Sequence, residues 1–164
     1  MIEVELVGVS LDSASNTPVV VLQEVPAPAR TLSIFIGTPE ATAIAFALEH
    51  VEPPRPLTHD LIKNMLDAVE IVVERVVIAE LRDSTFFAEL HLSDGDAEWV
   101  VSCRPSDALA VAVRVDCQIF VAEPVLEVAG ISAAAEELED GDPEEVVEEF
   151  RQFIETINPD DFAL

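Results

Sequence analysis

Three runs of strand-like residues open the chain. Ile2, Val4 and Leu6 alternate with glutamates, and a period of two residues is typical of a strand with one buried face. A second run holds consecutive aliphatic residues over 19–22, and a third run stops at Gly37. The predicted strands cover residues 2–11, 17–25 and 31–36.

Two helices are expected next. Thr38 and Pro39 precede an acidic residue, which is a helix-start pattern because Thr caps, Pro fits the first turn and the acid complements the helix dipole. This helix is expected to run to about Val51, and its apolar residues on most sides predict burial. Thr58 is expected to cap a second helix over residues 59–68.

The second half of the chain repeats the change from strands to helix. β-Branched and aromatic residues fill three segments, with the hairpin signal Asp94-Gly95 between the last two. Ser106 is expected to cap the helix that follows, which ends at about Arg114. The predicted strands cover residues 71–81, 85–92, 97–103 and 118–121, and a helical turn is predicted over 124–129.

The order βββ-α-α-βββ-α-β keeps runs of strands apart from the helices. This favours an α+β domain with a mostly antiparallel or mixed sheet, which we assign to residues 1–130. Residues 131–164 form an acidic tail, in which 132–142 are expected to be either helical or disordered. An amphipathic helix is expected at about 143–157, with one apolar stripe made by Val146, Val147, Phe150, Phe153, Ile154 and Ile157.

Charge narrows the choice of partners. The chain has 8 basic and 33 acidic residues, a formal net charge of −25. Residues 1–130 contribute 7 basic and 21 acidic residues (−14), and residues 131–164 contribute 1 and 12 (−11). Such a field repels polyphosphate at long range, so a nucleic-acid partner is opposed by the net charge and would need local arginines or a divalent cation. The acidic tail is expected to bind a protein partner or to cap the oligomer.

The remaining composition predicts a cytoplasmic protein. No apolar run reaches the roughly 18 residues that a membrane helix needs, and the first residues lack the basic start of a signal peptide. Cys103 and Cys117 are too few for a disulfide framework or a zinc site. We expect two free, buried thiols, with a reactive Cys103 of lowered pKa as the alternative. Five glycines without a phosphate-loop pattern exclude a nucleotide cofactor bound by such a loop.

Two segments share one local pattern, namely Arg55-Pro56-Leu57-Thr58-His59-Asp60 and Arg104-Pro105-Ser106-Asp107. Arginine beside the free N–H groups of a helix start suits a phosphate or a carboxylate. The structural alternative is that each arginine forms a salt bridge with Asp60 or Asp107 and holds its own loop. The predicted anion-binding residues are Arg55, Arg104, Thr58 and Ser106.

Histidine and carboxylates at the same helix starts are candidates for catalysis. His59 is expected to act as a general acid or base, with Asp60 and Asp107 as catalytic partners. Glu40, Asp60 and Asp107 all fall in first helical turns and offer the oxygen ligands that Mg²⁺ or Mn²⁺ prefers. The alternatives are a surface histidine and carboxylates that only complement helix dipoles.

Several groups of residues, taken in chain order, carry a resemblance to a known family. They are Leu32–Gly37 with Glu40, Ala41, Ile44 and Ala45; Arg55–Leu61; Phe86–Ala88 with Leu90; Arg104–Ala108 with Ala110 and Ala112; Ile119–Val121; and Val125, Leu126, Ala129 and Gly130. In these residues the chain resembles the bifunctional nuclease domain family, which was long a bacterial domain of unknown function and is also found in plants. The resemblance spans about residues 3–130 and leaves the tail outside. It implies a compact α+β domain, a homo-oligomer with a dimer favoured, and nuclease activity on RNA and DNA.

The sequence therefore supports two functions. The first is a nuclease that hydrolyses phosphodiester bonds with the help of a divalent metal ion. The alternative is a non-enzymatic, oligomeric module that binds a small anion or a protein partner in the same pocket.

Overall fold

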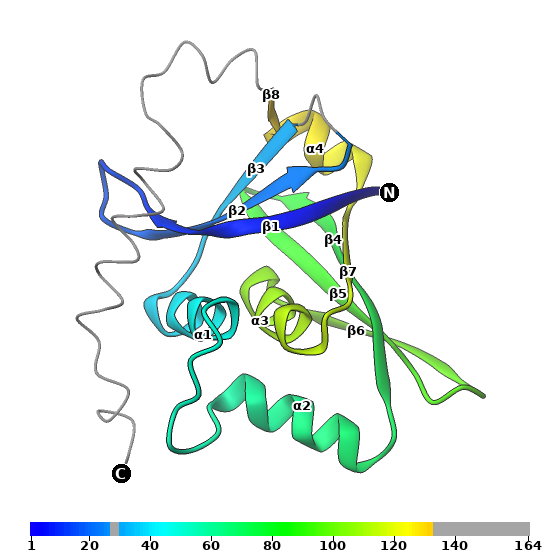
Figure 1. Ribbon diagram of the computed structural model, residues 1–164. Helices are drawn as coiled ribbons and strands as arrows, with labels where there is room; N and C mark the ends of the chain where they lie inside the picture. Colours follow the sequence, from blue (N-terminus) through cyan, green and yellow to red (C-terminus); the bar gives the residue numbers. More distant parts are fainter. Residues whose placement is uncertain (27–29, 133–164) are drawn as a thin grey trace.

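A computed structural model of the chain describes residues 1–26 and 30–132 (Figure 1). The predicted amphipathic helix at 143–157 and all of the tail after Ser132 lie outside these residues. The strands are β1 (Ile2–Leu11), β2 (Pro18–Glu24), β3 (Arg30–Phe35), β4 (Val72–Arg82), β5 (Thr85–Ser93), β6 (Glu98–Cys103), β7 (Gln118–Val121) and β8 (Ile131–Ser132). The helices are α1 (Thr38–Leu48), α2 (Thr58–Ala68), α3 (Pro105–Val115) and α4 (Glu123–Ala129).

The α+β class and the predicted element order are confirmed, and the expected helical turn is α4. Strand β8 was not predicted, because two residues carry no periodic pattern; it forms by pairing antiparallel with the start of β3. Helix α1 ends at Leu48 instead of about Val51. The chain leaves the helix there because His50 adopts a left-handed φ of 53°, which ends a right-handed helix.

The eight strands form one mixed sheet in the order β6-β5-β4-β7-β1-β2-β3-β8. Neighbouring strands are antiparallel except β4 and β7, which run parallel with Val76 opposite Ile119. On its other side β7 is antiparallel to β1, where Ile119 faces Val4. The short strand β7 therefore joins the β1–β2–β3 meander to the β4–β5–β6 meander, and the connection from β6 to β7 carries α3.

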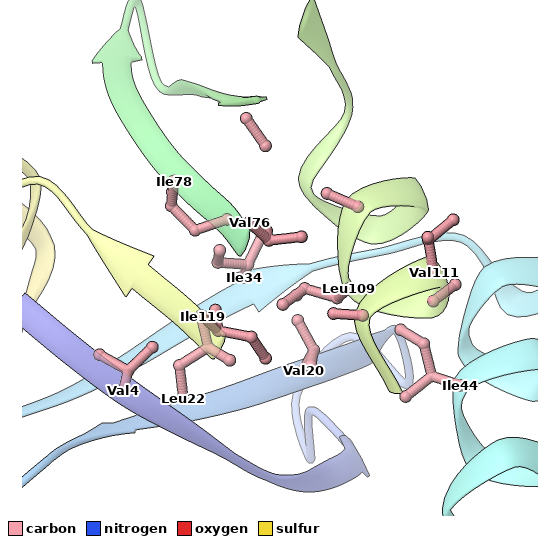
Figure 2. Close-up of a cluster of buried hydrophobic side chains, with 14 of the residues drawn as sticks. Val4, Val20, Leu22, Ile34, Ile44, Val76, Ile78, Leu109, Val111 and Ile119 are labelled. Atoms are coloured by element: carbon pink, nitrogen blue, oxygen red, sulfur yellow. The ribbon is translucent and has the colours of Figure 1, made fainter. Parts of the chain in front are cut away.

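Helices α1 and α3 lie side by side against the sheet, and α2 packs on α3 from the far side (Figure 1). The core lies between the sheet and helices α1 and α3, where Val20, Val76 and Ile78 of the sheet belong to one buried cluster with Ile44 and Leu109 of the helices (Figure 2). Burying each such side chain contributes roughly 1.5–3 kcal/mol. None of the described helices has the length and hydropathy to cross a membrane.

Small residues allow α3 to approach both of its neighbours. Ala108, Ala110 and Ala112 are at most 1% exposed, and an alanine adds little bulk between a helix and the surface it packs on. Because α3 contacts both α1 and α2, it fixes the starts of these two helices relative to its own start. The buried alanines therefore belong to the helix that packs on both α1 and α2.

The N-caps of α1, α2 and α3 all differ from the predicted ones. Thr58 and Ser106 were expected to cap α2 and α3, but the N-caps are Leu57 and Arg104, and neither helix has a hydroxyl cap. Pro105 explains the shift at α3, because proline fits the first helical position and makes the residue before it the cap. Ser106 therefore lies inside the first turn.

Helix α2 uses a carboxylate in place of a hydroxyl cap. The Leu57 N–H donates to Asp60 Oδ2 at 2.8 Å, which satisfies one of the donors that a helix start leaves open. Helix α1 starts one residue earlier than expected, with Gly37 as N-cap and Thr38 inside the helix. In all three helices the acidic residue predicted for the first turn is present there.

Candidate functional site

The starts of α1, α2 and α3 surround one pocket of about 770 Å³. Its walls come from the first turn of α1, from the loop and first turn of α2, and from Arg104 and Asp107 at α3. Each helix start leaves backbone N–H groups without helical partners and carries the positive end of the helix dipole. The pocket therefore favours an anionic group, although its own side chains include two carboxylates.

Arg104 lies at the mouth of the pocket, where 65% of its side chain is exposed. Its Nε donates to Asp107 Oδ2 at 2.7 Å, and its Nη2 donates to Asp107 Oδ1 at 2.9 Å and to Glu40 Oε1 at 2.8 Å. These hydrogen bonds raise the pKa of Arg104 above its ordinary value. Exposed ion pairs contribute only about 0–1 kcal/mol, so the guanidinium can exchange a carboxylate for another anion at little cost.

His59 is buried, with 6% of its surface exposed, so the alternative of a surface histidine is wrong. Its Nε2 lies 3.2 Å from Asp107 Oδ1. Burial opposes ionisation of Asp107, but the hydrogen bonds from Arg104 and His59 outweigh it, and the pKa of Asp107 is lowered. An ionised Asp107 orients the imidazole and holds the arginine with the same carboxylate.

Asp60 belongs to a different cluster. Its Oδ1 accepts a hydrogen bond from Arg114 Nε at 2.6 Å, and it does not line the pocket. Arg114 also donates to the carbonyl oxygens of Ala110 at 2.7 Å and Ala43 at 3.0 Å. With 7% of its side chain exposed, Arg114 ties α1, α2 and α3 together. Asp60 therefore has a structural role, and Arg114 is the arginine with which it forms a salt bridge.

The predicted anion-binding residues separate in space. Arg104 and Thr58 line the pocket, whereas Arg55 and Ser106 do not. Arg55 is exposed on the loop before α2, and Ser106 is buried in the first turn of α3. The two similar Arg-Pro segments thus contribute unequally, since only the second one places its arginine at the pocket.

The three carboxylates predicted to bind a metal ion do not form one group. Glu40 and Asp107 share the Arg104 guanidinium, while Asp60 is engaged by Arg114. Within residues 1–26 and 30–132, no cluster of three or more His, Cys, Asp or Glu side chains has the geometry of a metal site. What the pocket offers is a pair of hard oxygen donors, which is the number that Mg²⁺ often takes from a protein when substrate phosphate supplies the rest.

Two residues that position the site were not recognised from the sequence. Arg114 sits in the last turn of an otherwise apolar helix, and a lone arginine in such a run was the available signal. Gly37 precedes α1, and a side chain there would collide with the Glu40 carboxylate. Glycine at position 37 thus lets Glu40 fold back toward Arg104.

Both cysteines are free and half-buried. Burial raises the pKa of Cys103 and of Cys117 to about 11 in each case, so the predicted alternative of a reactive Cys103 thiol of lowered pKa is wrong. The negative charges of the nearby Asp107 and Glu89 carboxylates also raise the pKa of Cys103.

Native alkylation of the thiols is therefore expected to be slow. Relative to the ordinary value of 9.0, a pKa of about 11 lowers the thiolate fraction near pH 8 by roughly 100-fold. Iodoacetamide labelling followed by mass spectrometry should show this difference as a slower rate of alkylation in the native chain than in the urea-unfolded chain. Equal labelling rates in both states would contradict the burial of the thiols.

The same pKa difference affects stability. The thiols of the unfolded chain ionise at a lower pH than those of the folded chain, so the free energy of unfolding should fall as the pH rises above 9.0.

Comparison with known proteins shows the family of the chain. Residues 20–134 match the family model of the bifunctional nuclease domain. An uncharacterized protein of Mycobacterium tuberculosis is 42% identical over 163 residues, which cover 98% of this chain and 97% of that protein. Bifunctional nuclease 1 of Arabidopsis thaliana is 31% identical over 115 residues, which cover 68% of this chain but 35% of the plant protein. Bifunctional nuclease 2 of the same plant is 33% identical over 93 residues, 28% of its length.

Proposed function

Because this chain belongs to the bifunctional nuclease domain family, we propose that it hydrolyses phosphodiester bonds in the pocket at the starts of α1, α2 and α3. One observation carries the proposal, namely that Asp107 joins a buried histidine to an exposed arginine at the same pocket. The names of the plant relatives support a nuclease activity, and the chain matches about a third of the length of those proteins.

In this proposal Arg104 holds the phosphate. Its guanidinium is exposed at the pocket mouth and has the fork geometry that binds two oxygens of a phosphodiester at once. The phosphate would displace Glu40, because Glu40 accepts one hydrogen bond from Arg104 whereas Asp107 accepts two. The nearby helix starts add N–H donors and a favourable dipole.

His59 serves as the general base. Its Nε2 is directed to Asp107, so Nδ1 carries the lone pair when the ring is neutral. The Nδ1 atom takes a proton from water as the water oxygen attacks phosphorus, and the bond from phosphorus to the leaving oxygen breaks. The leaving oxygen takes a proton from solvent water. Asp107 stabilises the imidazolium that has formed, which then returns its proton to the solvent.

Glu40 and Asp107 are the side chains that would hold a Mg²⁺ or Mn²⁺ ion together with the substrate phosphate. Such an ion would supply charge stabilisation at the phosphoryl oxygens. Asp60 has no part in this pair of ligands, because Arg114 engages it.

The test is cleavage of single-stranded RNA and DNA by the purified full chain, with and without EDTA. We expect Asp107→Asn to lower the rate by roughly 10- to 100-fold, because it weakens the hold on both His59 and Arg104. Asp83→Asn is the matched control, since Asp83 is an exposed turn residue with a φ of 48°, a conformation that asparagine tolerates.

Equal cleavage by wild type and Asp107→Asn would overturn the proposal and identify the activity as a contaminant. Thermal stabilisation by a nucleotide without any turnover would support a binding module in its place. Loss of cleavage on EDTA treatment supports the metal ion, and unchanged cleavage contradicts it.

The same variant is expected to change the pH dependence of stability. The pKa of Asp107 in the folded chain lies below its ordinary value of 3.8, so its interactions stabilise the fold above that pH and are lost as the pH falls through the folded value. The difference in free energy of unfolding between wild type and Asp107→Asn should therefore be constant near neutral pH and shrink in acid.

A further inference from the structure

The distribution of positive charge bears on the size of the substrate. We infer that the pocket acts on short phosphodiesters, on the scale of a dinucleotide, in preference to long strands; this inference rests on the proposed function. A protein that grips a long strand places several arginines or lysines along the path of its phosphates. The described residues that line the pocket offer one such contact.

Among the described residues that line the pocket, Arg104 is the one cation. Glu40 and Asp107 line the same pocket, so with neutral His59 the side chains there sum to −1. One phosphate can bind between the guanidinium and the helix starts. A second phosphate would meet carboxylates without a further positive partner.

Among the described residues, the basic side chains other than Arg104 do not line the pocket. Residues 1–130 contain seven of them, and five already have a carboxylate within 2.6–2.8 Å. Of these five, Arg30 and Arg82 lie on strands, and Arg114 is buried beneath α2. These paired cations are Arg30, Lys63, Arg82, Arg104 and Arg114.

The walls of the pocket suit a small organic group next to that phosphate. Apolar side chains, including Leu57 and Ile62, line it, and its volume of about 770 Å³ falls in the range of roughly 300–1,000 Å³ that small-molecule sites have. Binding of single strands commonly uses aromatic residues on which successive bases stack. The strongly exposed aromatic residues Phe35 and Trp99 do not line the pocket.

The net charge of −25 also favours a short substrate over a long strand. Each added phosphate of a long strand increases the repulsion from the protein, whereas a dinucleoside monophosphate carries a single charge. Screening shortens the reach of this repulsion from about 30 Å at 0.01 M salt to about 10 Å at 0.1 M. Added salt should therefore accelerate cleavage of a long strand, which is the opposite of the usual loss of affinity through counterion release.

The experiment compares two substrates of one base composition, a uridine dinucleoside monophosphate and an oligouridylate of about 20 nucleotides. The full chain is assayed at about 0.01 M and about 0.15 M ionic strength. We expect kcat/KM per cleavable bond to be about 10-fold higher for the dinucleotide at low salt, a typical size for an electrostatic effect on association. The difference should narrow at the higher salt concentration. Arg104→Gln should slow cleavage of both substrates, which would place both reactions in one pocket.

Faster cleavage of the long substrate per bond, with a rate that falls as salt rises, would overturn the inference and leave the proposed function intact. Cleavage of neither substrate by the wild-type chain, at either ionic strength and with Mg²⁺ or Mn²⁺ present, would overturn the proposed function itself. The two failures are therefore distinguishable in one set of assays.

Discussion

Replacing His59 with glutamine is expected to lower kcat for phosphodiester cleavage by about 10²–10⁴-fold, the usual contribution of a general base. Glutamine can still hydrogen-bond to Asp107, but it cannot accept a proton at neutral pH. His59 has 8% of its side chain exposed, so a substitute that keeps a polar partner for Asp107 is needed to preserve the fold. KM should change less than kcat, because Arg104 and the helix starts still bind the phosphate.

His50→Asn is the matched control for this variant. His50 is an exposed histidine with a φ of 53°, where asparagine is well tolerated. Each protein should be assayed well below its own melting temperature, so that unfolding does not mimic a loss of chemistry. A His59→Gln protein that is folded and retains the kcat of the His50→Asn control would show that the histidine is not the base.

Replacing Arg114 with methionine is expected to destabilise the fold by about 3 kcal/mol, the lower part of the range for breaking a buried ion pair. Arg114 donates to Asp60 and to two backbone carbonyls, and methionine retains the apolar stem but none of the donors. The lower part of the range applies because Asp60 is 29% exposed, so water can solvate its carboxylate in part.

Urea unfolding of Arg114→Met, Asp60→Asn and the double variant measures this effect. Asparagine at position 60 keeps an acceptor for the Leu57 N–H, so the double variant should lose less than the sum of the two single variants. Asp60→Asn should also keep the catalytic activity in its folded fraction, since Asp60 lies outside the pocket. Strictly additive free energies would contradict the ion pair.

Local patterns predicted most elements because each element has a strong period or a strong stop signal. The alternation from Ile2 and the Asp94-Gly95 turn are of this kind. The position of β7 between β4 and β1 had no such signal. The place of β7 in the sheet depends on how α3 packs and returns the chain to the sheet. That packing involves residues far apart in the sequence, so no local pattern predicts it.

The candidate site was predicted in part for the same reason. Arg104 and Asp107 are three positions apart in the sequence, so their spacing alone could suggest the salt bridge. The contacts from Asp107 to His59 and from Arg114 to Asp60 span 48 and 54 residues. Sequence similarity between the two Arg-Pro segments indicated that Arg55 and Arg104 would act alike, but the packing of α2 on α3 brings only Arg104 to the pocket.

The most direct test of a phosphodiester site at these helix starts is the ratio of kcat/KM for Arg104→Gln to that for Arg82→Gln on a dinucleoside monophosphate. Arg82 is the matched control, because it is also an exposed arginine paired with a carboxylate and lies outside the pocket. We expect Arg82→Gln to match the wild type and Arg104→Gln to be lower by about 10- to 100-fold, as for a lost charged hydrogen bond. An Arg104→Gln protein with the kcat/KM of the control would contradict the account.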